Sequence, residues 1–139
     1  MQKTLILPGL LLGLAFASTA VAADCPTLPQ GAGVQWEETE GKSYKVCRAI
    51  DQDGTQLLGV MFTDSEPLKL RRRNRVEEGW VGQHVVVWYR PEIAEAGAAE
   101  KRITVVELDE DRYAQIWLDA NDPDQLRRAM NLAQQLYLH

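Results

Sequence analysis

The sequence predicts an α+β fold in which an antiparallel sheet of five to seven strands, largely a meander, packs against one C-terminal amphipathic helix. Short β-branched and aromatic runs, separated by turn residues, fill the chain from residue 34 to residue 118. The one strong helical pattern comes after them. Helices that are segregated to one end of a chain are typical of α+β proteins, whereas α/β proteins alternate helices with strands.

The first 22 residues have the three parts of a secretory signal peptide. Lys3 supplies a positive charge, an uncharged apolar stretch follows over residues 5–17, and Ala20 and Ala22 stand in A-x-A spacing. An uncleaved membrane anchor is the alternative, but proline and glycine interrupt the apolar stretch. We therefore expect cleavage after Ala22 and a periplasmic or secreted protein.

The rest of the chain, residues 23–139, has the size of one domain. No later apolar run is long enough to cross a membrane, so no membrane span is expected after cleavage. The formal net charge of the whole chain is −5, which argues against nucleic-acid binding, because nucleic-acid-binding domains are usually basic. Residues 69–92 form the exception, with six basic and three acidic side chains.

The chain has two cysteines, Cys25 and Cys47. An even number of cysteines in an exported chain favours a disulfide. Such a bridge would contribute about 3 kcal/mol in the chain-entropy model. A catalytic thiol or a metal pair is the alternative, but a reactive thiol needs a neighbouring base, and the only histidines are His84 and His139.

The first three strands are expected over residues 34–38, 43–50 and 55–62. The first alternates weakly and suits a short edge strand. The second alternates clearly between two faces, and "DQDG" at residues 51–54 predicts a tight turn that makes the second and third strands a hairpin.

The next two strands are expected over residues 68–72 and 84–90. In the first, leucines alternate with basic residues until the strand ends or bulges near Arg72; "EEGWVG" then predicts a turn over residues 77–82. The second strand is β-branched and aromatic, which suits a central position. Residues 91–101 are rich in alanine and glycine and predict a loop or one helical turn.

The last two strands are expected over residues 102–108 and 113–118, joined by an acidic turn. The helix follows, because Asp122 suits the N-cap, Pro123 the first helical position and Gln125 the third position past the cap. Its apolar residues recur at helical spacing and predict one buried stripe. The stripe consists of Leu126, Ala129, Met130, Ala133, Leu136 and Tyr137.

The candidate binding residues lie in "KLRRRNRVEEGW". They are five basic residues and one tryptophan: Lys69, Arg71, Arg72, Arg73, Arg75 and Trp80. Arginine and tryptophan are enriched in protein interfaces, so an acidic protein partner is one interpretation. A solvated edge that discourages sheet-to-sheet aggregation is another, and an envelope polyanion is a third. Trp80 could also fold back to cover the edge of the sheet.

Motifs for catalysis and for metals are missing from the sequence. Neither mature serine stands in a G-x-S-x-G elbow, no histidine–cysteine pair has zinc spacing, and "DQDG" lacks the later ligands of a calcium loop. No glycine-rich phosphate loop is present. We therefore expect no catalytic residues, no metal and no cofactor.

These observations predict an exported, periplasmic binding protein that acts on a protein partner in the cell envelope. An inhibitor, an immunity-type protein or an envelope accessory protein would fit, on the basis of size, export, disulfide and missing catalytic groups. The alternative is a binder of a small apolar molecule near Trp88 and Trp117, or of a polyanion through residues 69–75. A hydrolase with scattered carboxylates is less favoured.

Overall fold

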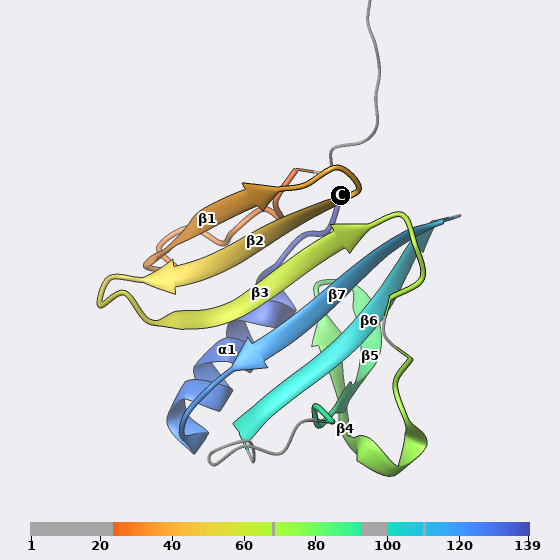
Figure 1. Cartoon of the computed structure of the whole chain (residues 1–139). Helices are drawn as coiled ribbons and strands as arrows, with labels where there is room; N and C mark the ends of the chain where they lie inside the picture. Colours follow the sequence, from red (N-terminus) through yellow and green to blue (C-terminus); the bar gives the residue numbers. More distant parts are fainter. Residues whose placement is uncertain (1–23, 68, 93–99, 110) are drawn as a thin grey trace, which may run out of the picture.

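The computed structural model describes residues 24–67, 69–92, 100–109 and 111–139 (Figure 1). Within these residues, seven antiparallel strands form one sheet, and one α-helix follows them. The strands are β1 (Val34–Glu40), β2 (Tyr44–Asp51), β3 (Gln56–Thr63), β4 (Arg75–Val81), β5 (His84–Tyr89), β6 (Lys101–Asp109) and β7 (Arg112–Asp119), and the helix is α1 (Pro123–Gln135). The predicted α+β class, with an antiparallel sheet and a C-terminal helix, is therefore confirmed. The proposed signal peptide and its cleavage site lie outside the described residues.

Six of the predicted strands coincide with β1, β2, β3, β5, β6 and β7 to within two residues at each end. The strands lie in the order β1-β2-β3-β7-β6-β5-β4, so the last strand, β7, returns to pair with β3 in the middle of the sheet. Strands β1 and β4 are consequently the two edges. Most of residues 91–101, where a loop or helical turn was expected, lies outside the described residues.

The sheet is nearly interrupted between β5 and β6. Their ladder contains one residue pair, Tyr89 with Ile103, whereas β6 and β7 pair along most of their length. Beyond this pair, the hydroxyl of Thr104 on β6 donates to the carbonyl oxygen of Val87 on β5 at 2.8 Å. A side chain thus replaces a rung of the backbone ladder, and the β4–β5 hairpin diverges from the rest of the sheet.

Two sequence predictions about the chain between β3 and β5 are wrong. No strand forms at the described part of residues 68–72: residues 69–71 have no regular structure, and the 3₁₀ helix η1 (Arg72–Asn74) follows them. The predicted turn over residues 77–82 is instead mostly strand β4, and the turn is confined to Gly82 and Gln83.

Tertiary contacts explain why strand β4 forms where a turn was predicted. A side chain at Gly79 would meet the indole of Trp88, because a Cβ there would lie 2.5 Å from the indole nitrogen. The glycine therefore leaves space for the Trp88 ring against β4. On the same strand, two residues earlier, Glu77 forms an ion pair with Arg102 of β6. Both contacts join residues that are far apart in sequence, so the local pattern does not reveal them.

Helix α1 begins where its cap residues predict. The Asp122 carboxylate accepts from the backbone N–H of Gln125 at 2.8 Å, and the Gln125 side chain accepts from the backbone N–H of Asn121 at 2.9 Å. Pro123 occupies the first turn, where its missing N–H needs no partner. Within the described residues, no helix is both long and apolar enough to cross a bilayer.

The far end of the predicted apolar stripe needs a correction. The helix ends at Gln135, and Tyr137 lies in extended backbone with 54% of its surface exposed. Leu132, which was not assigned to the stripe, is buried together with Ala129 and Ala133. Once the chain leaves the helix, the side-chain spacing of a helix no longer applies, so Tyr137 points outward while Leu136 and Leu138 are buried.

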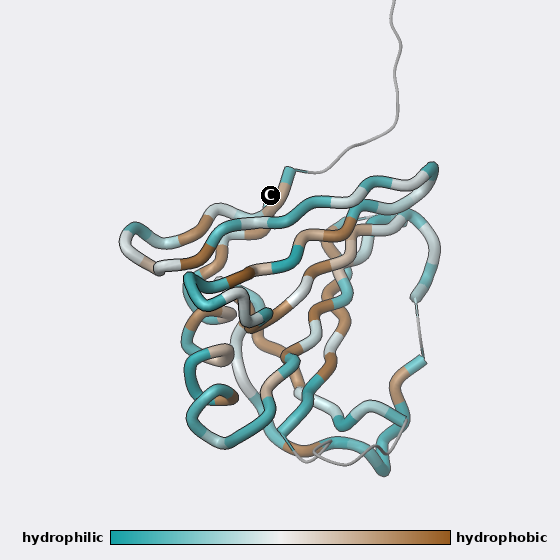
Figure 2. Tube along the Cα trace, turned by 60° about the vertical axis from the view of Figure 1, so that its left-hand side comes forward, coloured by the Kyte–Doolittle hydropathy of each residue, from teal (hydrophilic) through white to brown (hydrophobic). Residues whose placement is uncertain are grey.

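The core lies between one face of the sheet and α1 (Figure 2). The helix contacts β3 and β7 in the middle of the sheet and also the edge strand β4, so the sheet curls around the helix. The backbone N–H of Gly82, in the turn after β4, donates to the carbonyl oxygen of Ala133 at 2.9 Å. This bond fixes the curled edge to the last turn of the helix.

The N-terminal segment closes one side of the core. A disulfide joins Cys25 to Cys47, which is fully buried on β2. The indole N–H of Trp36 donates to the carbonyl oxygen of Pro26 at 2.8 Å, and Thr27 pairs with Tyr137 through backbone hydrogen bonds of 3.1 and 3.3 Å. The predicted disulfide therefore links the sheet to a segment that also holds the C-terminal residues in place.

Asp51 closes the turn between β2 and β3. Its Oδ1 accepts from the backbone N–H groups of Asp53 and Thr55, each at 2.9 Å, and its Oδ2 lies 3.4 Å from Nη2 of Arg128 on α1. The pKa of Asp51 lies below its ordinary value, mainly because its carboxylate accepts the hydrogen bond from the backbone of Thr55; Arg128 lowers the pKa further. The ionised carboxylate thus connects this turn to the helix.

We expect Gly82→Ala to destabilise the protein more than Gly54→Ala. Both glycines have a positive φ, 56° at Gly82 and 82° at Gly54, so alanine is strained at either position. At Gly82 an added Cβ would also lie 2.3 Å from the carbonyl oxygen of Leu136, whereas nothing lies within 4 Å at Gly54. The free energy of unfolding should fall by about 1 kcal/mol in Gly54→Ala and by about 2 kcal/mol or more in Gly82→Ala. Urea unfolding followed by tryptophan fluorescence measures both, and equal losses would show that the contact with Leu136 relaxes freely.

Candidate functional site

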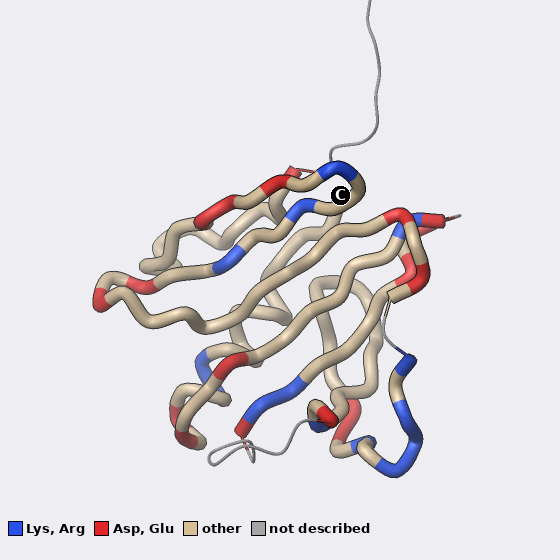
Figure 3. Tube along the Cα trace, in the orientation of Figure 1, with Lys and Arg blue, Asp and Glu red and all other residues tan. Residues whose placement is uncertain are grey.

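The basic segment, which we define as Lys69, Arg71, Arg72, Arg73 and Arg75, follows β3 and ends at the first residue of β4. In Figure 3, Lys and Arg positions follow one another along this segment, while Asp and Glu positions lie along β1, the other edge strand. All five cations are exposed, and Leu70 between them is half-buried. The cations lie on three kinds of backbone: the irregular residues 69–71, the 3₁₀ helix η1 and, for Arg75, the first residue of β4.

Glu92 lies against part of the basic segment. One oxygen of its carboxylate, Oε1, is 3.3 Å from Nε of Arg71 and 3.6 Å from Nη2 of Arg73. The side-chain amide of Asn74 donates to the same oxygen at 3.1 Å, and the backbone N–H of Arg90 donates to the carbonyl oxygen of Asn74 at 2.8 Å. The backbone turn at η1 thus brings the side chains of Arg71, Arg73 and Asn74 close to the Glu92 carboxylate.

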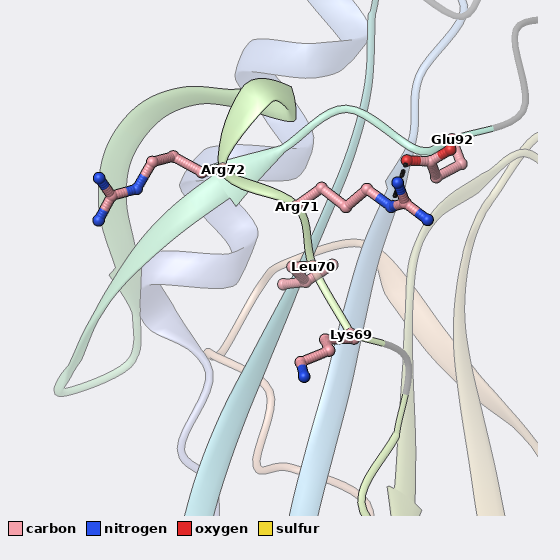
Figure 4. Close-up of a pocket in the computed structure, with 5 residues that line it drawn as sticks. All are labelled: Lys69, Leu70, Arg71, Arg72 and Glu92. Atoms are coloured by element: carbon pink, nitrogen blue, oxygen red, sulfur yellow. Dashed lines mark ion pairs between the residues drawn. The ribbon is translucent and has the colours of Figure 1, made fainter.

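The other three cations, Lys69, Arg72 and Arg75, form no ion pair with any residue that the structure describes. In Figure 4 the side chain of Arg72 extends away from Glu92, while that of Arg71 reaches toward it. Lys69, Leu70, Arg71, Arg72 and Glu92 together line a surface depression with a volume of about 650 Å³. The depression is therefore positively charged and has an apolar side chain in its wall.

Trp80 lies on the edge strand β4 and is 47% exposed. Its cross-strand partner on β5 is Val85, which is 62% exposed. Arg75 is paired with Tyr89 on the same two strands. Directly paired residues in an antiparallel ladder share a face, and Val81 and Trp88 point into the core on the opposite face.

The hairpin therefore presents an exposed apolar pair, Trp80 with Val85, at the end of β4 that is remote from the basic segment. Sequence reasoning identified Trp80 but not Val85. Recognising β4 as a strand would have found Val85, because the tight turn at Gly82 and Gln83 places the two residues opposite each other.

The other tryptophans serve the fold. The indole of Trp88 is 2% exposed and lies in the core, whereas Trp117 packs over Gly59, where an added Cβ would lie 2.1 Å from its ring. On β7, Trp117 stands between Ile116 and Leu118, which point into the core. Successive side chains of a strand point to opposite faces, so Trp117 lies on the face of the sheet opposite to Trp88. Of the two indoles, only that of Trp88 therefore faces the space between the sheet and α1.

An ion pair between buried Arg102 and exposed Glu77 ties β4 to β6. Nε of Arg102, a buried residue on β6, donates to Oε1 of Glu77 at 2.8 Å, and its Nη1 donates to the carbonyl oxygen of Lys101 at 2.9 Å. The contact crosses the position where β5 and β6 diverge, so it holds β4 to β6 directly. Nothing in the sequence pattern distinguished Arg102 from the exposed arginines.

The histidines occupy separate places. His84 is half-buried at the start of β5, and Nε2 of His139 lies 2.9 Å from the hydroxyl of Thr27, with its ring against Tyr137. Among the described residues, no group of three or more His, Cys, Asp and Glu side chains could hold a metal ion.

Comparison of the chain with protein-family models, with curated proteins and with solved structures found no significant match.

We expect Glu77→Ala to destabilise the protein more than Glu78→Ala. Glu77 is a partner of buried Arg102, whereas its neighbour Glu78 is exposed and contacts no described charged group. Because the Glu77 side chain is 42% exposed, its loss should lower the free energy of unfolding by about 1–2 kcal/mol, less than the loss of one partner of a fully buried pair. Glu78→Ala should change it by less than about 0.5 kcal/mol. Chemical unfolding measures the difference, and similar values for the two variants would mean that Glu77 contributes no support to β4.

Proposed function

We propose that this chain is an exported, periplasmic binding protein that acts through contact with an acidic protein in the cell envelope. Roles as an inhibitor, an immunity-type protein or an envelope accessory protein fit this proposal. The leader-like residues 1–22 and the disulfide between Cys25 and Cys47 support the compartment, because disulfides persist outside the reducing cytosol.

The observation that carries the proposal is that β4 has the basic segment at its start and the exposed pair Trp80–Val85 at its other end. Three of the cations have no anionic partner among the described residues, and arginine and tryptophan are the side chains that most often anchor protein interfaces. Strand β4, which carries Arg75 and Trp80, pairs with β5 and is tied to β6 through the ion pair of Glu77 with Arg102.

The same cations favour a second candidate, an anionic polymer or lipid surface of the envelope. Salt separates the two. Polyanion binding is dominated by charge and should weaken steeply as ionic strength rises, whereas a protein contact that buries Trp80 and Val85 should keep much of its affinity.

Capture of the disulfide-bonded protein's partner from envelope extract, followed by binding of the purified partner, tests the proposal. The double variant Arg72→Glu/Arg75→Glu should weaken binding of that partner at least about tenfold, because it reverses two cations that have no described ionic partner. Trp80→Ala should weaken it by a similar factor. Calorimetry with the purified partner measures the affinities.

Lys42→Glu/Arg127→Glu is the matched control, since it changes the net charge by the same amount at two exposed positions on other elements. This control should bind within about twofold of the wild type. If the captured proteins and their affinities are the same for the wild type, the double variant and Trp80→Ala, the proposal is wrong.

A further inference from the structure

The basic segment contains a preformed carboxylate site that the protein fills with its own side chain. We propose that Arg71, Arg73 and Asn74 bind an acidic side chain of the partner, and that Glu92 occupies this position in the free protein as an internal competitor. The inference rests on the proposed function and specifies how the partner is recognised.

Three side chains surround one oxygen of Glu92, Oε1. The amide of Asn74 donates a hydrogen bond to it at 3.1 Å, and guanidinium nitrogens of Arg71 and Arg73 lie 3.3 and 3.6 Å from it as ion-pair partners. Two guanidinium groups face one carboxylate, so the constellation keeps a surplus of one positive charge. A carboxylate is the group that arginine forks and amide donors recognise best, which is why an acidic side chain is the expected occupant.

Both arginine contacts with Glu92 are longer than the shortest ion pairs of the protein and similar in length to that of Arg128 with Asp51, at 3.4 Å. The pairs Arg102–Glu77, Lys101–Asp119 and Arg112–Asp109 each measure 2.8 Å, whereas both arginine contacts to Glu92 exceed 3.2 Å. The Glu92 side chain is also 46% exposed. Exposed ion pairs of this kind contribute little to stability, so a partner carboxylate can displace Glu92 without disturbing the fold.

The surroundings leave room for the exchange. Glu92 and Arg71 line the depression of about 650 Å³ together with Lys69, Leu70 and Arg72 (Figure 4). Two of the cations without a described ionic partner, Lys69 and Arg72, line the same depression. They would attract an acidic side chain, and Arg71, Arg73 and Asn74 would fix its orientation.

An internal competitor reduces the apparent affinity by the fraction of time that the site is free. If Glu92 occupies the site for roughly 70–90% of the time, its removal should raise the affinity for an acidic ligand by about 3- to 10-fold. If the contacts of Glu92 were instead structural, removing Glu92 would leave the basic segment less ordered and would weaken binding of the acidic ligand.

Poly-L-glutamate is a suitable probe, and its affinity for the disulfide-bonded protein can be measured by calorimetry at fixed salt. Glu92→Gln should bind it about 3- to 10-fold more tightly than the wild type. Glu78→Gln is the matched control, because it removes the same charge from an exposed residue that contacts none of the arginines, and it should bind within about twofold of the wild type. Adding Arg71→Lys to Glu92→Gln should cancel the gain, since lysine keeps the charge but loses the planar donor group.

Nuclear magnetic resonance provides a direct readout. On addition of poly-L-glutamate, the side-chain amide of Asn74 and Nε–H of Arg71 should shift in Glu92→Gln more than they do in the wild type. The inference would be overturned if Glu92→Gln and Glu78→Gln bound poly-L-glutamate with equal affinity, or if neither variant bound it measurably. A gain in Glu92→Gln that appears only with phosphatidylglycerol vesicles would also overturn it. The proposed function would still be judged separately, by the effect of Arg72→Glu/Arg75→Glu on the captured partner.

Discussion

The curl of the sheet around a single helix is the constraint on which the structure depends. One helix of 13 residues covers one face, so the two halves of the seven-stranded sheet must approach it from different sides. The hydrogen bond from Gly82 to Ala133 holds the curled edge against the helix, and only a residue without Cβ fits there, beside the carbonyl of Leu136. The residues before β1 and after α1 then close the remaining side of the core, and the disulfide fixes that closure to β2.

The basic segment follows from this architecture. Strand β3 ends near one end of the sheet, and the chain must travel to the opposite edge before β4 can begin, because β7, β6 and β5 lie between them. The connection therefore runs outside the ladder, where its charged side chains remain in solvent. Cations on a connecting segment add little to the stability of the sheet, and their accumulation in an otherwise acidic chain is the feature from which we propose a binding role. Arg75, by contrast, is on the edge strand itself, where a charged residue also discourages pairing with another sheet.

Local signals made most of the fold predictable. The start of α1 depends on three neighbouring residues, Asp122, Pro123 and Gln125, and the alternation in β2 and β3 surrounds a turn that four residues specify. The sequence predictions are wrong where a contact between residues far apart in the sequence determines the local structure. Strand β4 has the composition of a turn, but Gly79 accommodates the ring of Trp88. The cations of the candidate site could be named from the sequence, whereas Glu92 could not, because its approach to Arg71 and Arg73 depends on η1.

The narrow junction between β5 and β6 affects the cooperativity of unfolding. The β4–β5 hairpin is attached to the larger part of the sheet by one residue pair, by the Thr104 hydroxyl and by the pair of Arg102 with Glu77, whereas β2, β3 and β7 have paired neighbours on both sides. Elements with so few shared hydrogen bonds open at a lower free energy than the whole molecule. We expect the backbone amides of β4 and β5 to exchange with deuterium before those of β3 and β7. The surface that carries Trp80 and Val85 would then belong to a unit that can shift against a partner while the disulfide-linked half stays folded.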